Sequence, residues 1–546
     1  MKKLIAITLS VMMVVTMLAA CGNTDDAADS AETTAASADE AASVEETSSE
    51  INYDSELVVG VSSDIGSMDQ LGAGTSGAII KKILVYESLF YLDENQELLP
   101  LLAKSYTDLG DGTYEVELFD YIYDSEGNHI TASDVAFSFE QFIGSSGNTT
   151  TWKTITDYEA TGDYTFQFTM DPEMVGQLEN ILSRVSIISQ QSYEDSGDEL
   201  ATYPIGTGGY VLDTENSVSG SIYVFTRRDD YWQTDEEYIC DRNANYLKTL
   251  TVRIYTEAAT LANALEIGEI DFSSDIEATY WSMFLDDDGE ALDGYTTISG
   301  ENNAFVHLTF NCSDDSPFHD INLRKAMCYA IDAAALAYQV YGARGEVCYN
   351  ATNPNLFDTI ADDGSDYFGY DVEYAQELVD ASDYDGETIV MLVLPKYTVN
   401  SCAVLIQSYC AAVGINIELL EYDYATYRTV RQETENVEYD VELLGATSAV
   451  QYVYTASEDM GADYSSGLSR ILIEDETLDE LYTLISEAET DTEENVQAFL
   501  DYVEEQCYSY GLYYADKIFI GNSDKITDCV SLPFYGPLYN SIIVND

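Results

Sequence analysis

Basic residues are scarce in this chain: 21 Lys and Arg stand against 100 Asp and Glu in 546 residues, for a formal net charge of −79 at pH 7. Proteins bind nucleic acid through clustered Lys and Arg that contact phosphates, so the composition excludes that class of partner. The same charge repels anionic lipid surfaces. Solubility accounts for the acidic excess. Because chance alone places many carboxylates close together, pairs of them carry little information about a site.

Histidine is scarcer still, and the motifs of common enzymes are missing. The wide spacing of the three histidines, His129, His307 and His319, argues against a dedicated metal site. The eight cysteines after Cys21 form no C-x-x-C pair, so we expect most of them to be buried, with one or two disulfides still open. There is no G-x-S-x-G, no H-E-x-x-H and no supported acid/base pair. We therefore expect no catalysis, no metal and no cofactor.

Long apolar runs are also missing, apart from one at the N-terminus. Lys2 and Lys3 precede an uncharged run over 4–17, and small residues follow it, in the order of a secretory signal peptide. At roughly 14 residues the run falls short of the ~20 that span a bilayer. The sequence Leu-Ala-Ala-Cys resembles a bacterial lipobox, which implies cleavage after residue 20 and acylation of Cys21. Acyl chains bind membranes through their buried CH₂ groups.

Residues 21–53 form a polar, acidic segment. Positions 22–50 hold only Gly, Asn, Thr, Asp, Ala, Ser, Glu and a single Val. Such a composition buries too little apolar surface to fold, so we expect a disordered tether with a reach on the order of 30 Å. Signal peptide 1–20 and tether 21–53 together predict a body held at the outer face of the bacterial cytoplasmic membrane.

The remaining part of about 500 residues is long enough for two or three domains. Alternating or continuous apolar runs predict strands at 57–61, 113–119, 164–169, 223–226, 250–255, 304–310 and 439–444. Apolar residues at helical spacing predict helices at 77–90, 131–142 and 324–340, and Asp371 is the expected cap of another. The mixture favours an α/β fold.

One unit within this part has a clear topology. A strand at 388–394, a helix at 399–413 that stops at Gly414, and a strand at 415–421 follow one another. A strand, helix and strand of this length predict a right-handed parallel crossover. The middle third of the chain is therefore expected to be an α/β lobe, next to a larger mixed lobe in the first half.

Several fragments resemble one family when read in order. They are Val85-Tyr-Glu-Ser-Leu-Phe90, Leu102-Ala-Lys-Ser-Tyr106, Asp111-Gly-Thr-Tyr114, Thr131-Ala-Ser-Asp-Val-Ala-Phe-Ser-Phe139, Pro204-Ile-Gly-Thr-Gly-Gly-Tyr210, Asp230-Tyr-Trp232, Glu266-Ile-Gly-Glu-Ile-Asp271 and Leu323-Arg-Lys-Ala-Met-Cys-Tyr-Ala-Ile-Asp332. Each is weak alone, but their order over 57–540 is specific. It resembles the family 5 solute-binding proteins of bacterial ABC importers, the peptide/nickel type.

The resemblance implies a two-lobed fold of the type II periplasmic-binding-protein kind, hinged by two crossing segments. Lobe I would comprise 54–300, with an inserted subdomain at about 80–200. Lobe II would comprise 301–510, and 511–546 would return through the hinge to the C-terminal part of lobe I.

The function implied is that of a monomeric, lipid-anchored substrate-binding protein. It would capture oligopeptides in a closing cleft and deliver them to ABC permease and ATPase subunits. An oligosaccharide binder of the same fold stays open as an alternative. So do an exported hydrolase and a peptide-sensing signalling receptor, which belong to other functional classes.

The resemblance also implies where ligand is held. The expected contacts are Gly206, Thr207, Gly208, Gly209, Asn303, Lys396, Gly445, Ala446, Ala449 and Tyr452. Glycines would let backbone groups approach the ligand, although an ordinary turn explains the same loop. Lys396 would pair with an anion, unless it is a solvated surface lysine. Tyr452 belongs to a group of tyrosines that offers stacking faces, unless they serve ordinary packing.

Two of these positions depart from the family pattern. Many relatives carry a Gly-Trp pair and then an aspartate that clamps the amino terminus of a peptide. Here Ala446 stands at the tryptophan position and Ala449 at the aspartate position. The departure points to a longer peptide, a blocked peptide or a ligand that is no peptide.

Overall fold

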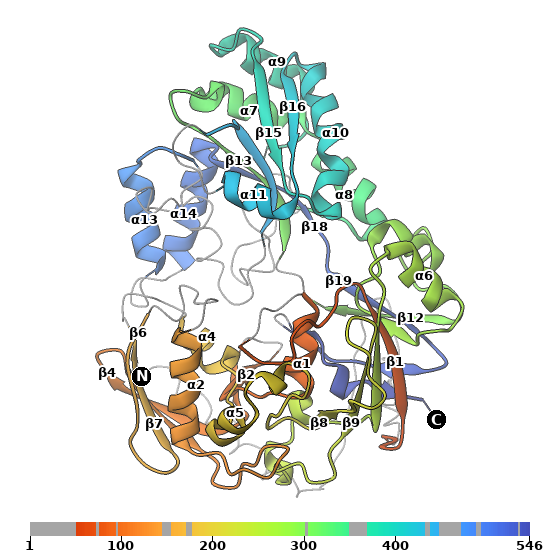
Figure 1. Cartoon of the computed structure of the whole chain (residues 1–546). Helices are drawn as coiled ribbons and strands as arrows, with labels where there is room; N and C mark the ends of the chain where they lie inside the picture. The colour runs from red at the N-terminus through yellow and green to blue at the C-terminus, as the bar shows by residue number, and fades with distance from the viewer. Residues whose placement is uncertain are drawn as a thin grey trace, which may run out of the picture. The chain divides into compact units, whose positions relative to one another are not determined.

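Two large β-sheets organise the folded part, and helices lie against both of them (Figure 1). The computed structural model describes residues 51–71, 76–93, 97–144, 154–170, 177–300, 304–348, 368–431, 437–446, 471–486, 493–532 and 535–545. All of these belong to one unit, Ile51–Asp546. Helices and strands are mixed along the chain, so the predicted α/β class is confirmed.

The first sheet has seven strands within the described residues. Their order is β12 (Tyr295–Gly300), β19 (Lys517–Asn522), β11 (Phe272–Ser273), β1 (Glu56–Val61), β10 (Thr249–Ile254), β9 (Ile222–Arg227) and β8 (Tyr210–Leu212). β1 runs parallel to both its neighbours, β10 and β11. Its residues Leu57, Val59 and Val61 are at most 2% exposed, because alternate side chains of a strand share one face. The strands expected at 57–61, 223–226 and 250–255 are confirmed.

The second sheet has six strands within the described residues. Their order is β14 (Glu346–Val347), β18 (Ser509–Tyr514), β13 (Phe305–Phe310), β17 (Val441–Ala446), β15 (Thr388–Val393) and β16 (Asn416–Glu421). β15 and β16 are parallel and are joined by α10 (Tyr397–Ala412), so the predicted strand–helix–strand unit is confirmed. Gly414 ends α10 with φ 83°, a conformation that glycine adopts without strain. One apolar core under this sheet runs from Val306 to Tyr513 in sequence.

A smaller sheet lies within the first half of the chain, in the order β4 (Ala103–Gly110), β5 (Thr113–Leu118), β7 (Thr165–Met170) and β6 (Ile155–Ala160). It shares a core with α2 (Ala132–Gly144) and α4 (Gln177–Arg184). The Asp134 carboxylate accepts hydrogen bonds from the Thr131 N–H at 2.8 Å and its hydroxyl at 2.9 Å, which fixes the start of α2 as predicted. The strands expected at 113–119 and 164–169 are confirmed.

The other helices cover the sheets or connect them. They are α1 (Ile79–Leu84), α5 (Gln190–Ser196), α6 (Ala258–Glu266), α7 (Ile321–Ala330), α8 (Ala333–Tyr341), α9 (Val372–Ala381), α11 (Tyr424–Arg431), α13 (Glu476–Ser486) and α14 (Glu493–Gln506). Short strand pairs are β2 (Phe90–Leu92) with β3 (Leu98–Pro100), β20 (Ile526–Asp528) with β23 (Ile543–Val544), and β21 (Ser531–Leu532) with β22 (Gly536–Pro537). No helix in the described part of the chain is long and apolar enough to cross a membrane.

Two predicted helices differ from those observed. The helix expected at 77–90 is only α1, after a 3₁₀ turn at Ser76–Ala78, and Phe90 already belongs to β2. The buried Arg242 guanidinium donates to the carbonyls of Lys82 at 2.5 Å, Ile83 at 2.7 Å and Tyr86 at 2.9 Å. Those carbonyls are therefore satisfied from a distant part of the sequence, and the chain leaves the helix there.

The helix expected at 324–340 is two helices, α7 and α8. Ile331 is extended, with φ −95° and ψ 125°, and interrupts the helical backbone. The Asp332 carboxylate then accepts a hydrogen bond from the Ala335 N–H at 2.9 Å and starts α8. The apolar spacing is helical on both sides of the break, so periodicity alone does not reveal it.

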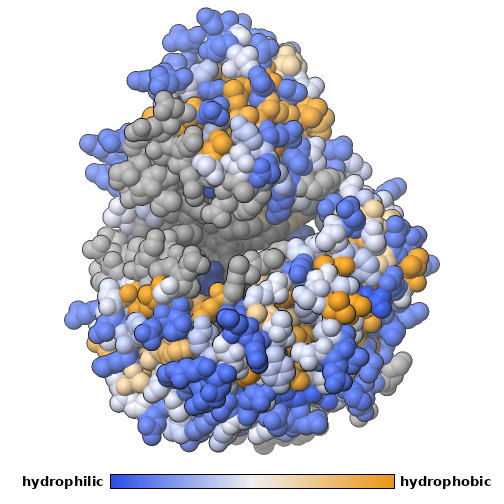
Figure 2. All heavy atoms as spheres, viewed as in Figure 1, coloured by the Kyte–Doolittle hydropathy of each residue, from blue (hydrophilic) through white to orange (hydrophobic). Residues whose placement is uncertain are grey.

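The chain passes between the two large sheets at two places. β12 belongs to the first sheet and β13 to the second, while β18 belongs to the second and β19 to the first. Only Ala515 and Asp516 separate β18 from β19. The lobe limits inferred from the family resemblance stay a prediction. The face seen in Figure 2 carries mostly hydrophilic residues, as expected for a chain with 100 acidic side chains.

Candidate functional site

A cavity of about 900 Å³ receives residues from both large sheets. In the first sheet, β1 and β11 are parallel, and Ser62 and Asp275 follow their carboxyl ends into the cavity. In the second, β15 and β17 are parallel, Lys396 follows β15 and Gly445 lies near the end of β17. Ligands of open α/β sheets bind beyond the carboxyl ends of parallel strands. In both sheets, the carboxyl ends of parallel strands therefore lead to this cavity.

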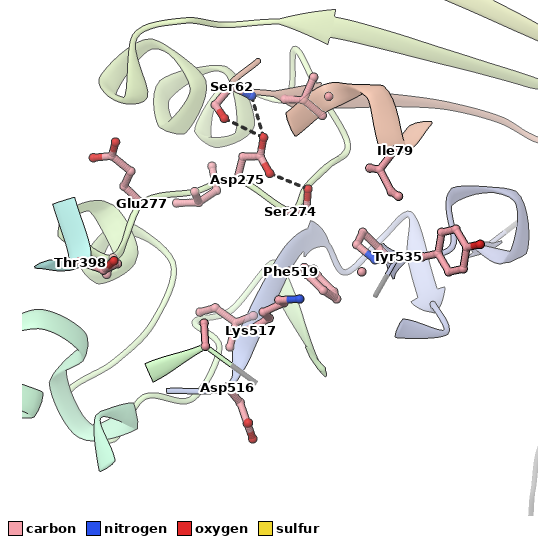
Figure 3. A pocket seen from close by; sticks show the side chains of 18 of the residues that line it. Ser62, Ile79, Ser274, Asp275, Glu277, Thr398, Asp516, Lys517, Phe519 and Tyr535 are labelled. Carbon is pink, nitrogen blue, oxygen red and sulfur yellow. Dashed lines mark hydrogen bonds between the residues drawn. The ribbon is translucent and has the colours of Figure 1, made fainter. Parts of the chain in front are cut away.

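On the side of the first sheet, hydrogen bonds join the segments that follow β1 and β11 (Figure 3). Asp275 Oδ2 accepts from the N–H and the hydroxyl of Ser62, each at 2.8 Å, and Oδ1 accepts from the Ser274 hydroxyl at 2.8 Å. Protein donors thus stabilise both oxygens of this carboxylate. Two of these hydrogen bonds link Asp275 to the residue that follows β1 and so position this rim of the cavity. In the described residues, no group of three His, Cys, Asp or Glu side chains is arranged to hold a metal ion.

Four lysines line the described part of the cavity: Lys81, Lys82, Lys396 and Lys517. Lys81 is 1% exposed, and its Nζ donates to the carbonyls of Ser67 at 2.5 Å and Asp69 at 2.8 Å. Burial lowers the pKa of Lys81 to about 8, with the charge of Lys82 acting in the same direction. Its head group is committed to holding the loop before α1.

The pKa values of the other three lysines are also lowered, each by its own surroundings. Lys396 is exposed to solvent, as the alternative of a surface lysine predicts, although the protein around it lowers its pKa by desolvation. Desolvation also lowers the pKa of Lys517, and the positive charge of Lys396 lowers it further. Desolvation lowers the pKa of Lys82, with the charge of Arg184 adding to the effect. Both Lys396 and Lys517 are among the residues that line the cavity.

An aromatic wall completes the cavity. Trp281 lies in a 3₁₀ turn at Ala278–Met283, and its ring centroid is 5.8 Å from that of Tyr341 at the end of α8. Tyr341 in turn contacts Tyr513 of β18, with centroids 6.1 Å apart. The Trp281 Nε1–H donates to the Ile276 carbonyl at 3.0 Å, which fixes the indole. Half-buried aromatic faces of this kind suit apolar side chains or sugar rings.

Of the residues predicted to bind ligand, Lys396 and Gly445 line the cavity. Asn303, Ala449 and Tyr452 lie outside the described residues. Ala446 is the last residue of β17, and its side chain also lies outside the described part. Contact of any of these residues with a ligand stays a prediction, as does the assignment of Ala446 and Ala449 to the clamp positions of the family.

The glycine loop Gly206–Gly209 lies elsewhere and packs on the end of α1. A Cβ on Gly206 would come within 2.1 Å of the Val85 carbonyl oxygen, and one on Gly208 within 2.5 Å of the Leu84 carbonyl oxygen. A Cβ on Gly209 would meet the Asn245 side-chain amide at 2.2 Å, and Thr207 is fully buried. None of the four is among the described residues that line the cavity. Close packing accounts for the glycines, and their contact with a ligand stays a prediction.

Sequence reasoning missed Lys82, Lys517, Trp281 and Asp275. These residues come from α1, β19 and the segment after β11, and only the fold brings them together. One signal was available. Lysine and arginine number only 21 in the whole chain, and a lysine in so acidic a protein is a candidate for a specific role.

Comparisons with known proteins agree on one group. Residues 97–462 match the middle region of the bacterial extracellular solute-binding proteins, family 5. A curated relative, the glutathione-binding protein GsiB of Escherichia coli (strain K12), is 26% identical over 310 residues. That match covers 55% of this chain and spans 57% of the length of the relative.

Solved structures show the same fold. The ABC transporter substrate-binding protein CtaP of Listeria monocytogenes has a TM-score of 0.75 at 19% identity, covering 90% of this chain and 100% of that one. The oligopeptide-binding protein AppA of Bacillus subtilis, in complex with a nonapeptide, has a TM-score of 0.69 at 18% identity. It covers 91% of this chain and 100% of that one.

Proposed function

The chain belongs to family 5 of the bacterial extracellular solute-binding proteins, and from this premise we propose that it is the lipid-anchored, ligand-capturing component of an ABC importer. It takes oligopeptides into the cavity and passes them to membrane permease and ATPase subunits. Cys21 carries the acyl anchor and 21–53 is the tether. The protein works as a monomer and performs no catalysis.

The observation that carries this proposal is the cavity, because both large sheets and both chain passages contribute to it. Its volume of about 900 Å³ lies within the ~300–1,000 Å³ of small-ligand sites. Residues on both sides of the passages, such as Ser62 and Lys396, line the same space. A ligand that contacts both sides favours the closed arrangement, since it binds that arrangement more tightly than an open one.

Two relatives support peptides as the ligand class, because their names state glutathione binding and oligopeptide binding. A second candidate, an oligosaccharide, is favoured by the aromatic wall of Trp281 and Tyr341, whose faces suit a sugar ring. The two candidates share one fold and differ only in the occupant of the cavity.

The test is a thermal-unfolding screen of the chain from residue 21 onward. Probes are free and N-acetylated peptides of about two to ten residues, glutathione, cello- and xylo-oligosaccharides, and nickel with histidine. A bound ligand at 100 times its Kd adds roughly 2.7 kcal/mol to the free energy of unfolding. Stabilisation by peptides supports the proposal, and stabilisation by sugars alone supports the second candidate.

Two further observations separate the remaining functional classes. Product release from chromogenic peptides or glycosides by the pure protein would show a hydrolase and contradict the proposal. Uptake of labelled peptide that depends on this chain and on a co-encoded permease and ATPase distinguishes import from sensing.

A further inference from the structure

The turn at 67–71, just before α1, is held in place by buried donors. The Nζ of Lys81 donates to two backbone carbonyls of this turn, at 2.5 and 2.8 Å. The Tyr86 hydroxyl donates to a third, the Met68 carbonyl, at 3.0 Å. Lys81 and Tyr86 are each 1% exposed, so solvent hardly competes for these hydrogen bonds. The backbone that carries Gln70 within this turn is therefore fixed by the fold.

Gln70 itself is a buried polar side chain that the protein does not use. It is 6% exposed and lines the cavity. Within the part of the chain that the structure describes, neither its Oε1 nor its Nε2 has a hydrogen-bond partner. A buried carboxamide without partners costs free energy that an apolar side chain of similar size does not. The stability of the fold therefore gives no reason for a glutamine at this position.

Several other polar groups of the described lining are already occupied by the protein. Backbone carbonyls hold Lys81, and three donors serve Asp275. The Tyr539 hydroxyl lies 2.9 Å from the hydroxyl of Ser274. Gln70 differs from them because its planar carboxamide offers a donor and an acceptor side by side to a molecule in the cavity.

The complement of a carboxamide is a group that also presents a donor and an acceptor side by side. In an extended peptide, the N–H and C=O of one residue point to the same side, as in the hydrogen-bonded pairs of antiparallel strands. A fixed carboxamide accepts from that N–H and donates to that C=O at the same time. These two hydrogen bonds do not involve the side chain of the peptide, so they suit peptides of varied sequence.

We propose that Gln70 is a ligand-binding residue, and that its carboxamide pairs with the main-chain N–H and C=O of one residue of an extended peptide in the cavity. Because Gln70 is already ordered by burial, it loses little side-chain freedom when the peptide binds. The proposal rests on the proposed function, since the peptide is the imported ligand.

The first test is urea unfolding of Gln70→Met without added peptide. We expect its midpoint to equal or exceed that of the wild type, because the thioether replaces a carboxamide that has no partner in the described chain. A structural role for Gln70 predicts the opposite, a lower midpoint.

The matched control is Gln233→Met. Gln233 is 3% exposed and lies outside the described lining of the cavity. Its Oε1 accepts hydrogen bonds from the Tyr121 hydroxyl at 3.2 Å and from the Asp235 N–H at 3.1 Å, so we expect this variant to have a lower midpoint. A loss of stability in Gln70→Met as large as in Gln233→Met would overturn the proposal.

The second test is isothermal titration with penta-alanine, used both with a free and with an acetylated amino terminus. We expect Gln70→Met to bind it at least about tenfold more weakly than the wild type, and Gln233→Met to bind it as the wild type does. Depsipeptide analogues, in which an ester oxygen replaces one amide N–H, locate the contact. One analogue should bind the wild type more weakly than penta-alanine does, but should lose no affinity for Gln70→Met, where the contact is already missing.

The outcomes separate this proposal from the proposed function. If the wild type and Gln70→Met bind penta-alanine equally, the assignment of Gln70 is overturned and peptide capture stands. If binding depends on Gln70 but peptide uptake does not require this chain, the assignment stands and the import role fails. If cello- or xylo-oligosaccharides bind through Gln70 and penta-alanine does not, the main-chain contact and peptide capture are both overturned. Binding of no probe overturns both as well.

Discussion

Gly206 shows how closely the loop before β8 approaches α1. A Cβ at this position would come within 2.1 Å of the Val85 carbonyl oxygen and 2.9 Å of the Tyr86 ring. A backbone carbonyl cannot move aside as a flexible side chain does, so Gly206→Ala forces the loop away from α1. We expect a loss of about 2–3 kcal/mol in the free energy of unfolding, measured by urea denaturation.

The matched control for this prediction is Gly144→Ala. Gly144 is the last residue of α2, and its added Cβ would meet nothing within 4 Å. Alanine is the better helix former, so we expect this variant to be unchanged or stabilised by up to about 1 kcal/mol. Equal stability of the two variants would contradict the packing role assigned to Gly206.

Lys81 makes stability depend on pH. In the unfolded chain its pKa is near 10.5, and in the fold desolvation lowers the pKa to about 8. Between these values the folded protein binds fewer protons than the unfolded chain, so the free energy of unfolding rises with pH across that window. Below about pH 8 both states carry the charge, and the full desolvation penalty of Lys81 is present.

Lys81→Met removes this dependence. Between about pH 7.5 and pH 9.5 we expect the wild type to gain roughly 2 kcal/mol of stability relative to the variant, from urea unfolding of both proteins. Comparing the two proteins cancels the titration of the other groups. A constant difference between them across this range would show that the amine of Lys81 keeps its usual pKa.

At the scale of elements, one side chain caps the helix that follows the break between α7 and α8. Asp332 caps α8 through the Ala335 N–H at 2.9 Å. We expect Asp332→Ala to lower the free energy of unfolding by about 1 kcal/mol, since α8 loses its side-chain cap. Asp332→Asn should restore most of the loss, because asparagine caps equally well. Asp380→Ala in α9, where the aspartate caps no helix, serves as control.

Local sequence signals predicted the elements whose ends are determined by residues close to them in the sequence. The unit β15–α10–β16 and the caps Thr131–Asp134 and Asp371 depend on spacing and on capping side chains, which the sequence displays directly. The end of α1 depends on Arg242, which is remote in sequence, and periodicity cannot show such a contact.

The candidate site was predictable only where the family pattern supplied positions. Lys396 and Gly445 follow from that pattern and line the cavity. Lys517 and Trp281 come together there because β19 pairs with β11, and these two strands are far apart in the sequence. The clamp positions Ala446 and Ala449 fall where the structure describes no side chain.

At the scale of the whole molecule, the negative charge of the chain determines which kinds of membrane anchor are possible. Removing Lys2 and Lys3 with the signal peptide leaves 19 basic against 100 acidic residues, a net charge of −81. Such a body is repelled from anionic lipid and cannot rely on a basic surface to stay at a membrane. For a protein held at a membrane as we propose, a basic surface patch is therefore unsuited to retention, and the lipobox resemblance predicts acylation of Cys21 instead.

Cys21→Ser tests this anchor in a bacterium that processes lipoproteins. We expect the wild-type chain in the membrane fraction, with acyl mass on an N-terminal peptide that begins at Cys21. The variant should lack that mass, because serine offers no thiol for the acyl chain, and it should not yield the N-terminal peptide that begins at residue 21. Cys240→Ser, which changes a half-buried cysteine of the folded body, should stay with the membrane. A wild-type chain without acyl mass that still begins at residue 1 would contradict the assignment of Cys21 as the anchor.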